Sequence, residues 1–153
     1  MESRESYEML LEAQCRNEEK LLYLLSQVKN YDLLLVEETA KFSPDCGALE
    51  YVTIQKDRLV KQMDALSLEI VKTQALIEET AEYFLDGKTH PLYQKLSVVR
   101  EIVSESFDDV LAAEDDAGTD IAKNLTIYRE RLLLEEKIKK VPQNKRQVFF
   151  VRL

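Results

Sequence analysis

A stretch of 39 residues, Ala48 to Asp86, contains neither glycine nor proline and repeats its apolar residues at spacings of three and four. One face of an α-helix returns at these spacings, so the stretch predicts a long helix that packs lengthwise against other helices. The apolar positions are Leu49, Val52, Leu59, Met63, Leu66, Ile70, Ile77 and Phe84.

A second apolar stripe runs through residues 3–42. It is broad enough to contact two neighbouring helices, as the inner helix of a bundle does. The stripe comprises Tyr7, Leu10, Leu21, Leu24, Val28, Tyr31 and Leu35, and it is widened by Leu11, Leu22, Leu25, Leu33, Leu34 and Val36.

Turn-forming residues separate these stretches from each other and from a third one. Ser43 can cap a helix, Pro44 suits the first helical position, and Asp45 favours the positive end of a helix dipole. Gly87 suits a left-handed helix stop, and Pro91 can begin the next helix. Such short connections place consecutive helices antiparallel.

The third stretch, residues 91–141, has an apolar stripe that falters around Gly118. A glycine costs a helix about 1 kcal/mol relative to alanine, and three aspartates beside it add little helix propensity, so we expect a kink or a stop there. An unbroken helix would be about 75 Å long against about 60 Å for the other two, and its last turns would overhang them. The apolar spacing resumes at Ile121, Leu125, Tyr128, Leu132 and Ile138.

The sequence therefore predicts an all-α protein, an elongated antiparallel bundle of three long helices, with a kink or break expected in the third helix near Gly118. Residues 1–141 would form a single domain, and residues 142–153 a short basic and aromatic tail. Residues 137–153 contain six bases and no acids, so residues 1–136 carry a formal charge of −14 against −8 for the whole chain.

Three interpretations of this C-terminal segment remain open. Its bases can complement the dipole of the third helix while Phe149 or Phe150 packs against the end of the bundle. It can instead be a short docking or self-masking segment, or a membrane contact through its basic and aromatic residues.

The sequence offers few groups for catalysis or for binding a metal or cofactor. His90 is the only histidine, and we expect it in a loop or at a helix cap; Cys15 and Cys46 form no ligand spacing. We therefore expect no enzyme activity, catalytic residue, cofactor or metal. The acidic charge disfavours nucleic acid as a partner, and no apolar run approaches the ~20 residues of a membrane span.

Two further expectations follow from the charges and the chain start. The glutamates of the first two helices most simply form a solvated face. A cytoplasmic location fits the unpaired cysteines and the acidic N-terminus. The glutamates concerned are, for example, Glu18, Glu19, Glu37 and Glu38.

The segment 48–59, Ala-Leu-Glu-Tyr-Val-Thr-Ile-Gln-Lys-Asp-Arg-Leu, resembles the start of the second helix in bacterial flagellar export chaperones of the FlgN and FliT kind. Those proteins tend to read Ala-Leu-Glu-x-Leu-x-x-x-Lys-x-x-Leu there. The later order of residues is also similar to theirs, except that Thr119 stands where an asparagine is common. That order is Asp116, Ile121, Leu125, Leu132, Ile138, Lys145 and Phe149.

The resemblance implies a cytoplasmic chaperone that holds late flagellar subunits, such as hook-filament junction proteins or the filament cap protein, before secretion. The C-terminal helical region would bind the amphipathic end of this protein client, with the tail covering the site when it is empty. The alternative is a structural coiled-coil or helical-bundle adaptor that self-associates, for example as a homodimer. The expected partner-binding residues are Ile121, Leu125, Tyr128, Leu132, Ile138, Phe149 and Phe150.

Overall fold

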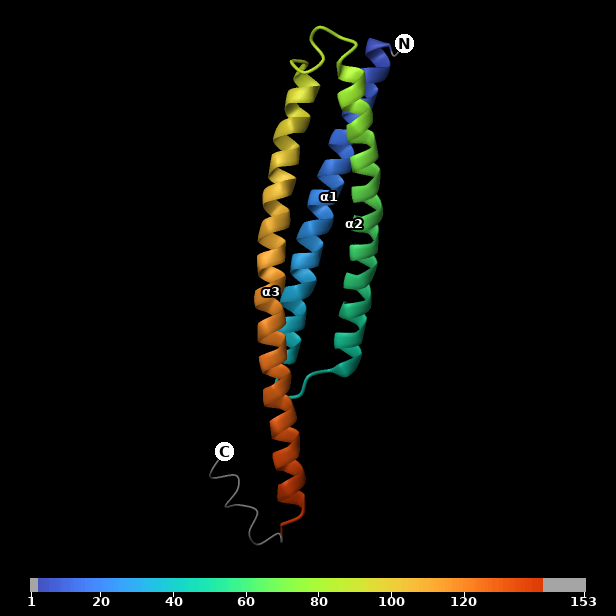
Figure 1. The fold of residues 1–153 in the computed structure, drawn as a ribbon. Coiled ribbons are helices and arrows are strands. Elements are labelled where there is room, and N and C mark those ends of the chain that lie inside the picture. The colour runs from blue at the N-terminus through green and yellow to red at the C-terminus, as the bar shows by residue number, and fades with distance from the viewer. Residues whose placement is uncertain (1–2, 142–153) are drawn as a thin grey trace.

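The computed structural model describes residues 3–141, which form three long α-helices joined by two short connections (Figure 1). These are α1 (Arg4–Thr39), α2 (Cys46–Ala81) and α3 (Pro91–Lys139). The two connections lie at opposite ends of α2, which therefore runs antiparallel to both α1 and α3. The predicted all-α, three-helix architecture is confirmed.

The helix α1 is the central element, because it packs along its length against α2 and against α3. The helices α2 and α3 approach each other only weakly. The prediction of an inner helix is thus confirmed for residues 4–39, although Leu33 and Leu34, which were expected to widen its stripe, are exposed.

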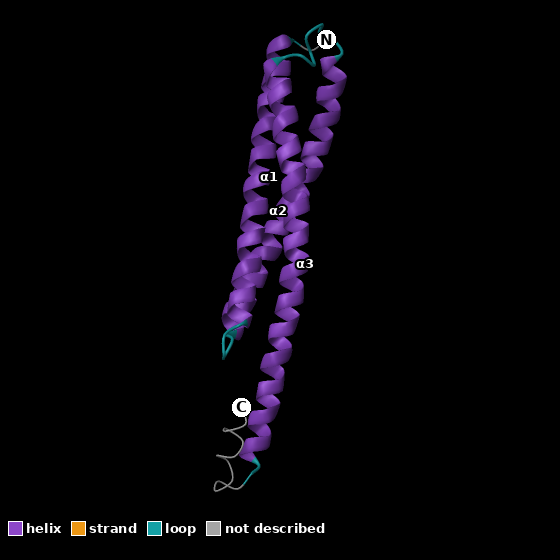
Figure 2. Ribbon diagram, turned by 90° about the vertical axis from the view of Figure 1, so that its left-hand side faces the viewer, coloured by secondary structure: helices purple, strands orange, loops and turns teal. Residues whose placement is uncertain are grey.

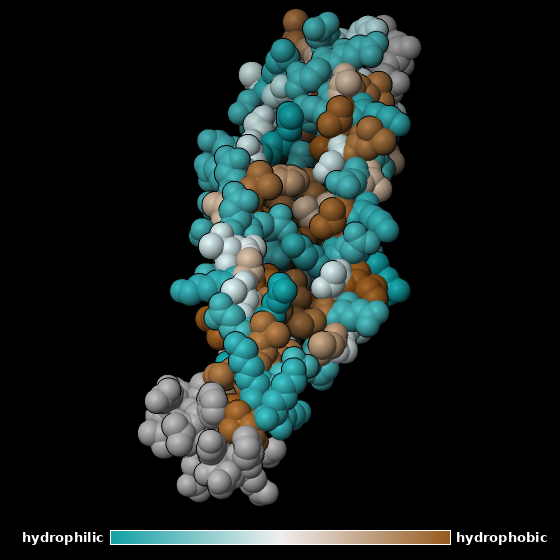
Figure 3. Space-filling view, turned by 60° about the horizontal axis from the view of Figure 1, so that its bottom comes forward, coloured by the Kyte–Doolittle hydropathy of each residue, from teal (hydrophilic) through white to brown (hydrophobic). Residues whose placement is uncertain are grey.

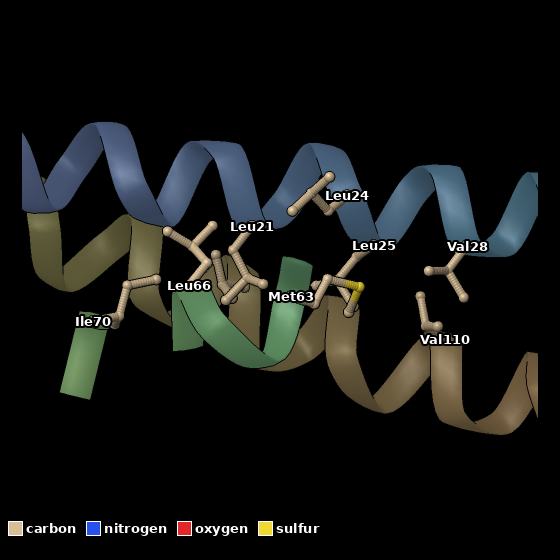
Figure 4. Close-up of a cluster of buried hydrophobic side chains, with 9 residues drawn as sticks. Leu21, Leu24, Leu25, Val28, Met63, Leu66, Ile70 and Val110 are labelled. Carbon is tan, nitrogen blue, oxygen red and sulfur yellow. The ribbon is translucent and has the colours of Figure 1, made fainter. Parts of the chain in front are cut away.

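The buried face of α1 follows an alternating spacing of four and three residues from Tyr7 to Asp32. Thr39 follows seven residues later, with the half-buried Leu35 between them. The apolar members of this face join two clusters with residues of α2 and α3. Figure 4 shows the larger cluster, in which Leu21 and Leu25 of α1 lie beside Leu66 and Met63 of α2, and Val28 of α1 lies beside Val110 of α3. This pattern produces the lengthwise packing of a coiled coil. The buried residues of this spacing are Tyr7, Leu11, Gln14, Glu18, Leu21, Leu25, Val28, Asp32 and Thr39.

The connection between α1 and α2 differs in detail from the expectation. The helix α1 ends at Thr39 rather than near Phe42, and the N-cap of α2 is Asp45, whose carboxylate accepts from the backbone N–H groups of Gly47 and Ala48. Ser43 therefore does not cap α2, and Pro44 is not its first residue. Proline disfavours helical geometry in the residue before it, which keeps both residues in the connection.

The helix α2 ends at Ala81, five residues before the predicted end at Asp86. The chain after it forms tight turns, in which Phe84 still packs against the buried cluster. Gly87 does not have the left-handed conformation that we expected, since no glycine of residues 3–141 has a positive φ. Its role is close approach, because an added Cβ would lie 2.1 Å from the carbonyl oxygen of Ala81.

The helix α3 is continuous through Gly118, so the expected kink or stop is wrong. Gly118 is exposed, and an added Cβ would meet no atom within 4 Å. Val110, about two turns before Gly118, and Ala117, directly before it, are buried against the bundle, and Asn124, six residues after it, donates to α1. These contacts offset the low helix propensity of one glycine, a cost of only about 1 kcal/mol.

Replacing Gly118 by alanine is expected to raise the free energy of unfolding by about 1 kcal/mol, because alanine favours the helix and the site has room for its methyl group. Urea denaturation followed by circular dichroism measures this change. A loss of stability would show that the helix does not continue through residue 118 as described.

Gly87→Ala is the matched variant at a crowded position, and it is expected to lower the free energy of unfolding by about 2 kcal/mol or more. Its Cβ would overlap the backbone of Ala81, and the shift would also strain the hydrogen bond of 2.7 Å that the buried Tyr7 hydroxyl donates to the Gly87 carbonyl. Urea denaturation measures this change as well. An unchanged free energy of unfolding would refute the close approach of Gly87 to the backbone of Ala81.

Candidate protein-binding site

The C-terminal part of α3 extends beyond the ends of the other two helices (Figures 1 and 2). Asn124 marks the place, because its side-chain amide donates to the Thr39 hydroxyl (3.1 Å) and to the Val36 carbonyl (3.3 Å) in the last turn of α1. We call residues 125–139 the α3 overhang. At 1.5 Å per residue it is about 22 Å long. The overhang anticipated for an unbroken third helix is therefore present.

Arg131 attaches the overhang to the connection between α1 and α2. Its guanidinium donates to the backbone carbonyl of Phe42 and lies 4.1 Å from the centre of the Phe42 ring. A cation over an aromatic face contributes about 0.5–1 kcal/mol at an exposed site. This contact supports the first half of the overhang, and α3 then continues to Lys139.

The predicted partner-binding residues have different exposures. Leu125 and Leu132 are 42% and 43% exposed, whereas Ile121 and Tyr128 are half-buried. Ile138 is buried. The two remaining predicted residues, Phe149 and Phe150, lie outside the described residues.

Two exposed apolar residues of the overhang were not predicted, namely Ile127 and Leu133. They lie off the stripe formed by Ile121, Leu125, Tyr128 and Leu132, so a search for one stripe overlooks them. Their signal in the sequence is the apolar density of the segment, in which Leu132, Leu133 and Leu134 are consecutive. The overhang is thus apolar on more than one side, which is unusual for a helix without a covering partner.

The apolar lines of the overhang continue the faces that pack against the bundle higher up in α3. Ile121 and Tyr128 follow Phe107 and Glu114 at steps of seven, and Glu114 contacts α2 through Lys56. Ile138 belongs to the line of Leu96, Val103, Val110 and Ala117, which are all buried, although the half-buried Asn124 and Arg131 occupy the two positions between Ala117 and Ile138. A repeat of seven keeps the same face toward the same neighbour in a coiled coil. The seven-residue packing pattern of α3 therefore continues beyond the ends of α1 and α2.

Polar side chains interrupt the buried face of α1, which the sequence pattern did not reveal. Glu18 was expected on a solvated face but is only 3% exposed, and its nearest base is Arg100 of α3 at 3.6 Å. Of the other glutamates expected there, Glu19 and Glu37 are exposed, while the carboxylate of Glu38 accepts from the backbone N–H of Asp45.

A three-helix ion-pair network surrounds the second buried carboxylate. Lys56 of α2 lies 2.7 Å from Asp32 of α1 and 2.7 Å from Glu114 of α3. Burial raises the pKa of Asp32, and the hydrogen bond with Lys56 opposes this shift. Closer to the N-terminus of α1, the side-chain amide of the buried Gln14 donates to the Ile70 carbonyl of α2 at 2.8 Å. These contacts join polar groups of different helices.

The single histidine is a helix cap, as predicted. The Nδ1 atom of His90 accepts from the backbone N–H of Leu92 at the start of α3, and Nε2 lies 2.9 Å from a carboxylate oxygen of Glu8. Cys15 is buried, which raises the pKa of its thiol, and Cys46 is exposed at the start of α2. Residues 3–141 contain no group of three or more metal-ligating side chains, and no helix among them has the length and apolar character of a membrane crossing.

Comparison of the chain with protein-family models, with curated proteins and with solved structures found no match.

The substitution Glu18→Gln tests how much the buried carboxylate lowers the free energy of unfolding. Burial raises the pKa of Glu18 above its ordinary value of 4.5, with the charge of Arg100 opposing the shift. The folded protein thus holds this proton more tightly than the unfolded chain does, and the stability from this group falls as the pH rises from about 4.5 through the folded pKa.

Thermal unfolding of both proteins between pH 4 and pH 8 measures this effect. The free energy of unfolding of Glu18→Gln relative to wild type is expected to increase with pH and then to level off. A difference in the free energy of unfolding that stays constant over the whole pH range would contradict the account.

Proposed function

We propose that the protein is a non-enzymatic chaperone of the cytoplasm that holds the amphipathic terminal segment of another protein on the α3 overhang. The observation that carries the proposal is the continuation of α3 past the ends of α1 and α2, with Leu125 and Leu132 of this segment exposed. An amphipathic helix or strand segment could cover these residues, as clients do in helix-in-groove recognition.

The resemblance to flagellar export chaperones supports the same region and suggests the client. In that family the C-terminal helical portion binds the disordered end of late flagellar subunits. We therefore propose hook-associated or filament cap proteins as clients. The length of the overhang, about 22 Å, corresponds to about four turns of a client helix.

A second candidate function is that of a helical adaptor which pairs with its own copy. It is favoured by the spacing of Leu125, Tyr128 and Leu132, because such a stripe can pack antiparallel against itself around a two-fold axis. The predicted homodimer would then use the overhang in place of the client. Light scattering of the purified protein separates the two functions.

The client proposal is tested by calorimetric titration of the protein with synthetic terminal peptides of hook-associated and cap proteins. Leu125→Asp and Leu132→Asp are each expected to weaken binding about tenfold or more, because the carboxylate would lose water on contact with the apolar client. Val98→Asp is the control, since Val98 is also an exposed apolar residue of α3, at 58%, and lies outside the overhang.

Two results would contradict the proposal. One is the absence of binding by wild type and also by the full-length variant Phe149→Ser/Phe150→Ser, in which a self-masking tail would be weakened. The other is a loss of affinity in Val98→Asp as large as in the two overhang variants. A tight dimer that Leu125→Asp converts into monomers, without any peptide binding, would favour the adaptor.

A further inference from the structure

The weak approach of α2 and α3 leaves a groove between them, whose floor is α1. This α2–α3 groove has a volume of about 360 Å³. Its apolar lining is Leu21 of the floor, Ile70 and Val71 of α2, and Val103 and Phe107 of α3. Figure 3 shows hydrophobic side chains gathered along the middle of this face, between two mostly hydrophilic edges.

Two polar contacts between α2 and α3 bound the groove along the molecule. Near one end, the Tyr93 hydroxyl of α3 donates to the Glu78 carboxylate of α2 at 2.9 Å. Toward the other end, Lys56 of α2 pairs with Glu114 of α3 at 2.7 Å. Residues 93 and 114 are about 32 Å apart along α3, at 1.5 Å per residue. The lined part of the groove between these contacts is shorter, since Arg100 and Asp108 are about 12 Å apart along α3, which corresponds to about two turns of a bound helix.

The walls of the groove keep apolar surface in contact with water. Val71 is 66% exposed although it lines the groove, and Phe107 is only partly buried against the core. In a four-helix bundle, a fourth helix would lie at this position and cover such residues. The three helices thus have the arrangement of a bundle that lacks one member.

The charge in the groove indicates the kind of helix that fits. The carboxylate of Glu18 lies in the floor with Arg100 at 3.6 Å as its nearest base, and Asp108 stands on the α3 wall. The long side chain of Arg100 is half-exposed and can move aside toward the solvent. Residues 1–136 as a whole carry a charge of −14, which attracts a basic partner.

We propose that the α2–α3 groove binds a basic amphipathic helix of a partner protein, whose apolar face covers Val71 and Phe107 and whose central lysine or arginine reaches Glu18. This surface is separate from the overhang, and the proposal does not depend on the proposed chaperone function. The occupant would complete a four-helix arrangement and pair the buried carboxylate with a second base.

The probe is a synthetic 18-residue peptide with leucines at alternating spacings of three and four and one central lysine, labelled for fluorescence anisotropy. A second peptide has glutamate in place of this lysine. The full-length protein is expected to bind the lysine peptide at least tenfold more tightly than the glutamate peptide. Glu18→Gln is expected to reduce this preference to threefold or less.

Val71→Glu places a charge on the exposed wall of the groove and is expected to weaken binding of the lysine peptide at least tenfold. Val98→Asp, at an exposed position of α3 outside the groove and the overhang, is the control and is expected to leave binding unchanged. Leu132→Asp reports whether the peptide binds to the overhang instead. Circular dichroism verifies that each variant retains its helix content, which the exposure of Val71 and Leu132 favours.

Three results would overturn the proposal. They are the absence of binding by the wild-type protein, equal binding of the two peptides, and unchanged binding by Val71→Glu. Loss of binding in Leu132→Asp alone would assign the peptide to the overhang and would likewise refute a site in the groove.

Discussion

The parallel packing of α3 against α1 in one register is the constraint on which the rest of the structure depends. Contacts that record this register occur along the whole of α1, from Glu8 with His90 to Thr39 with Asn124. Because α1 has 36 residues and α3 has 49, the register leaves the last turns of α3 beyond the bundle. The overhang is a direct consequence of pairing helices of unequal length from a common end.

Buried polar groups specify this register more sharply than apolar packing can. Leucine side chains would tolerate a shift of one helix by seven residues, whereas a shift of α1 would separate Lys56 from Asp32 and a shift of α3 would separate it from Glu114. Burying the carboxylate of Asp32 is costly unless it is paired, so a shift that separates it from Lys56 would be penalised by several kcal/mol. The ion-pair network and the Gln14 contact therefore give specificity at some expense of stability, as polar residues do at core positions of coiled coils.

Much of the fold could be predicted from the sequence, because the number of helices and the inner position of the first depend on apolar spacing alone. The continuity of α3 through Gly118 could not, since it depends on contacts with α1 on both sides of the glycine. The burial of Glu18 was not predicted, because a charged residue at a position of the apolar spacing is interpreted as an interruption of the apolar stripe. In the candidate site, Leu125 and Leu132 are exposed but Ile138 of the same stripe is buried, and Ile127 and Leu133 were missed because they lie off the main stripe.

The central claim is that the α3 overhang lacks the covering that α1 and α2 give to the rest of α3. Amide hydrogen exchange along α3 tests it most directly, in the free protein and in the presence of a client terminal peptide. The account predicts slow exchange between Leu96 and Ala117, much faster exchange after Asn124, and a slowing confined to the overhang when the peptide is added. Equal protection on both sides of Asn124 in the free protein, unchanged by any client peptide, would contradict it.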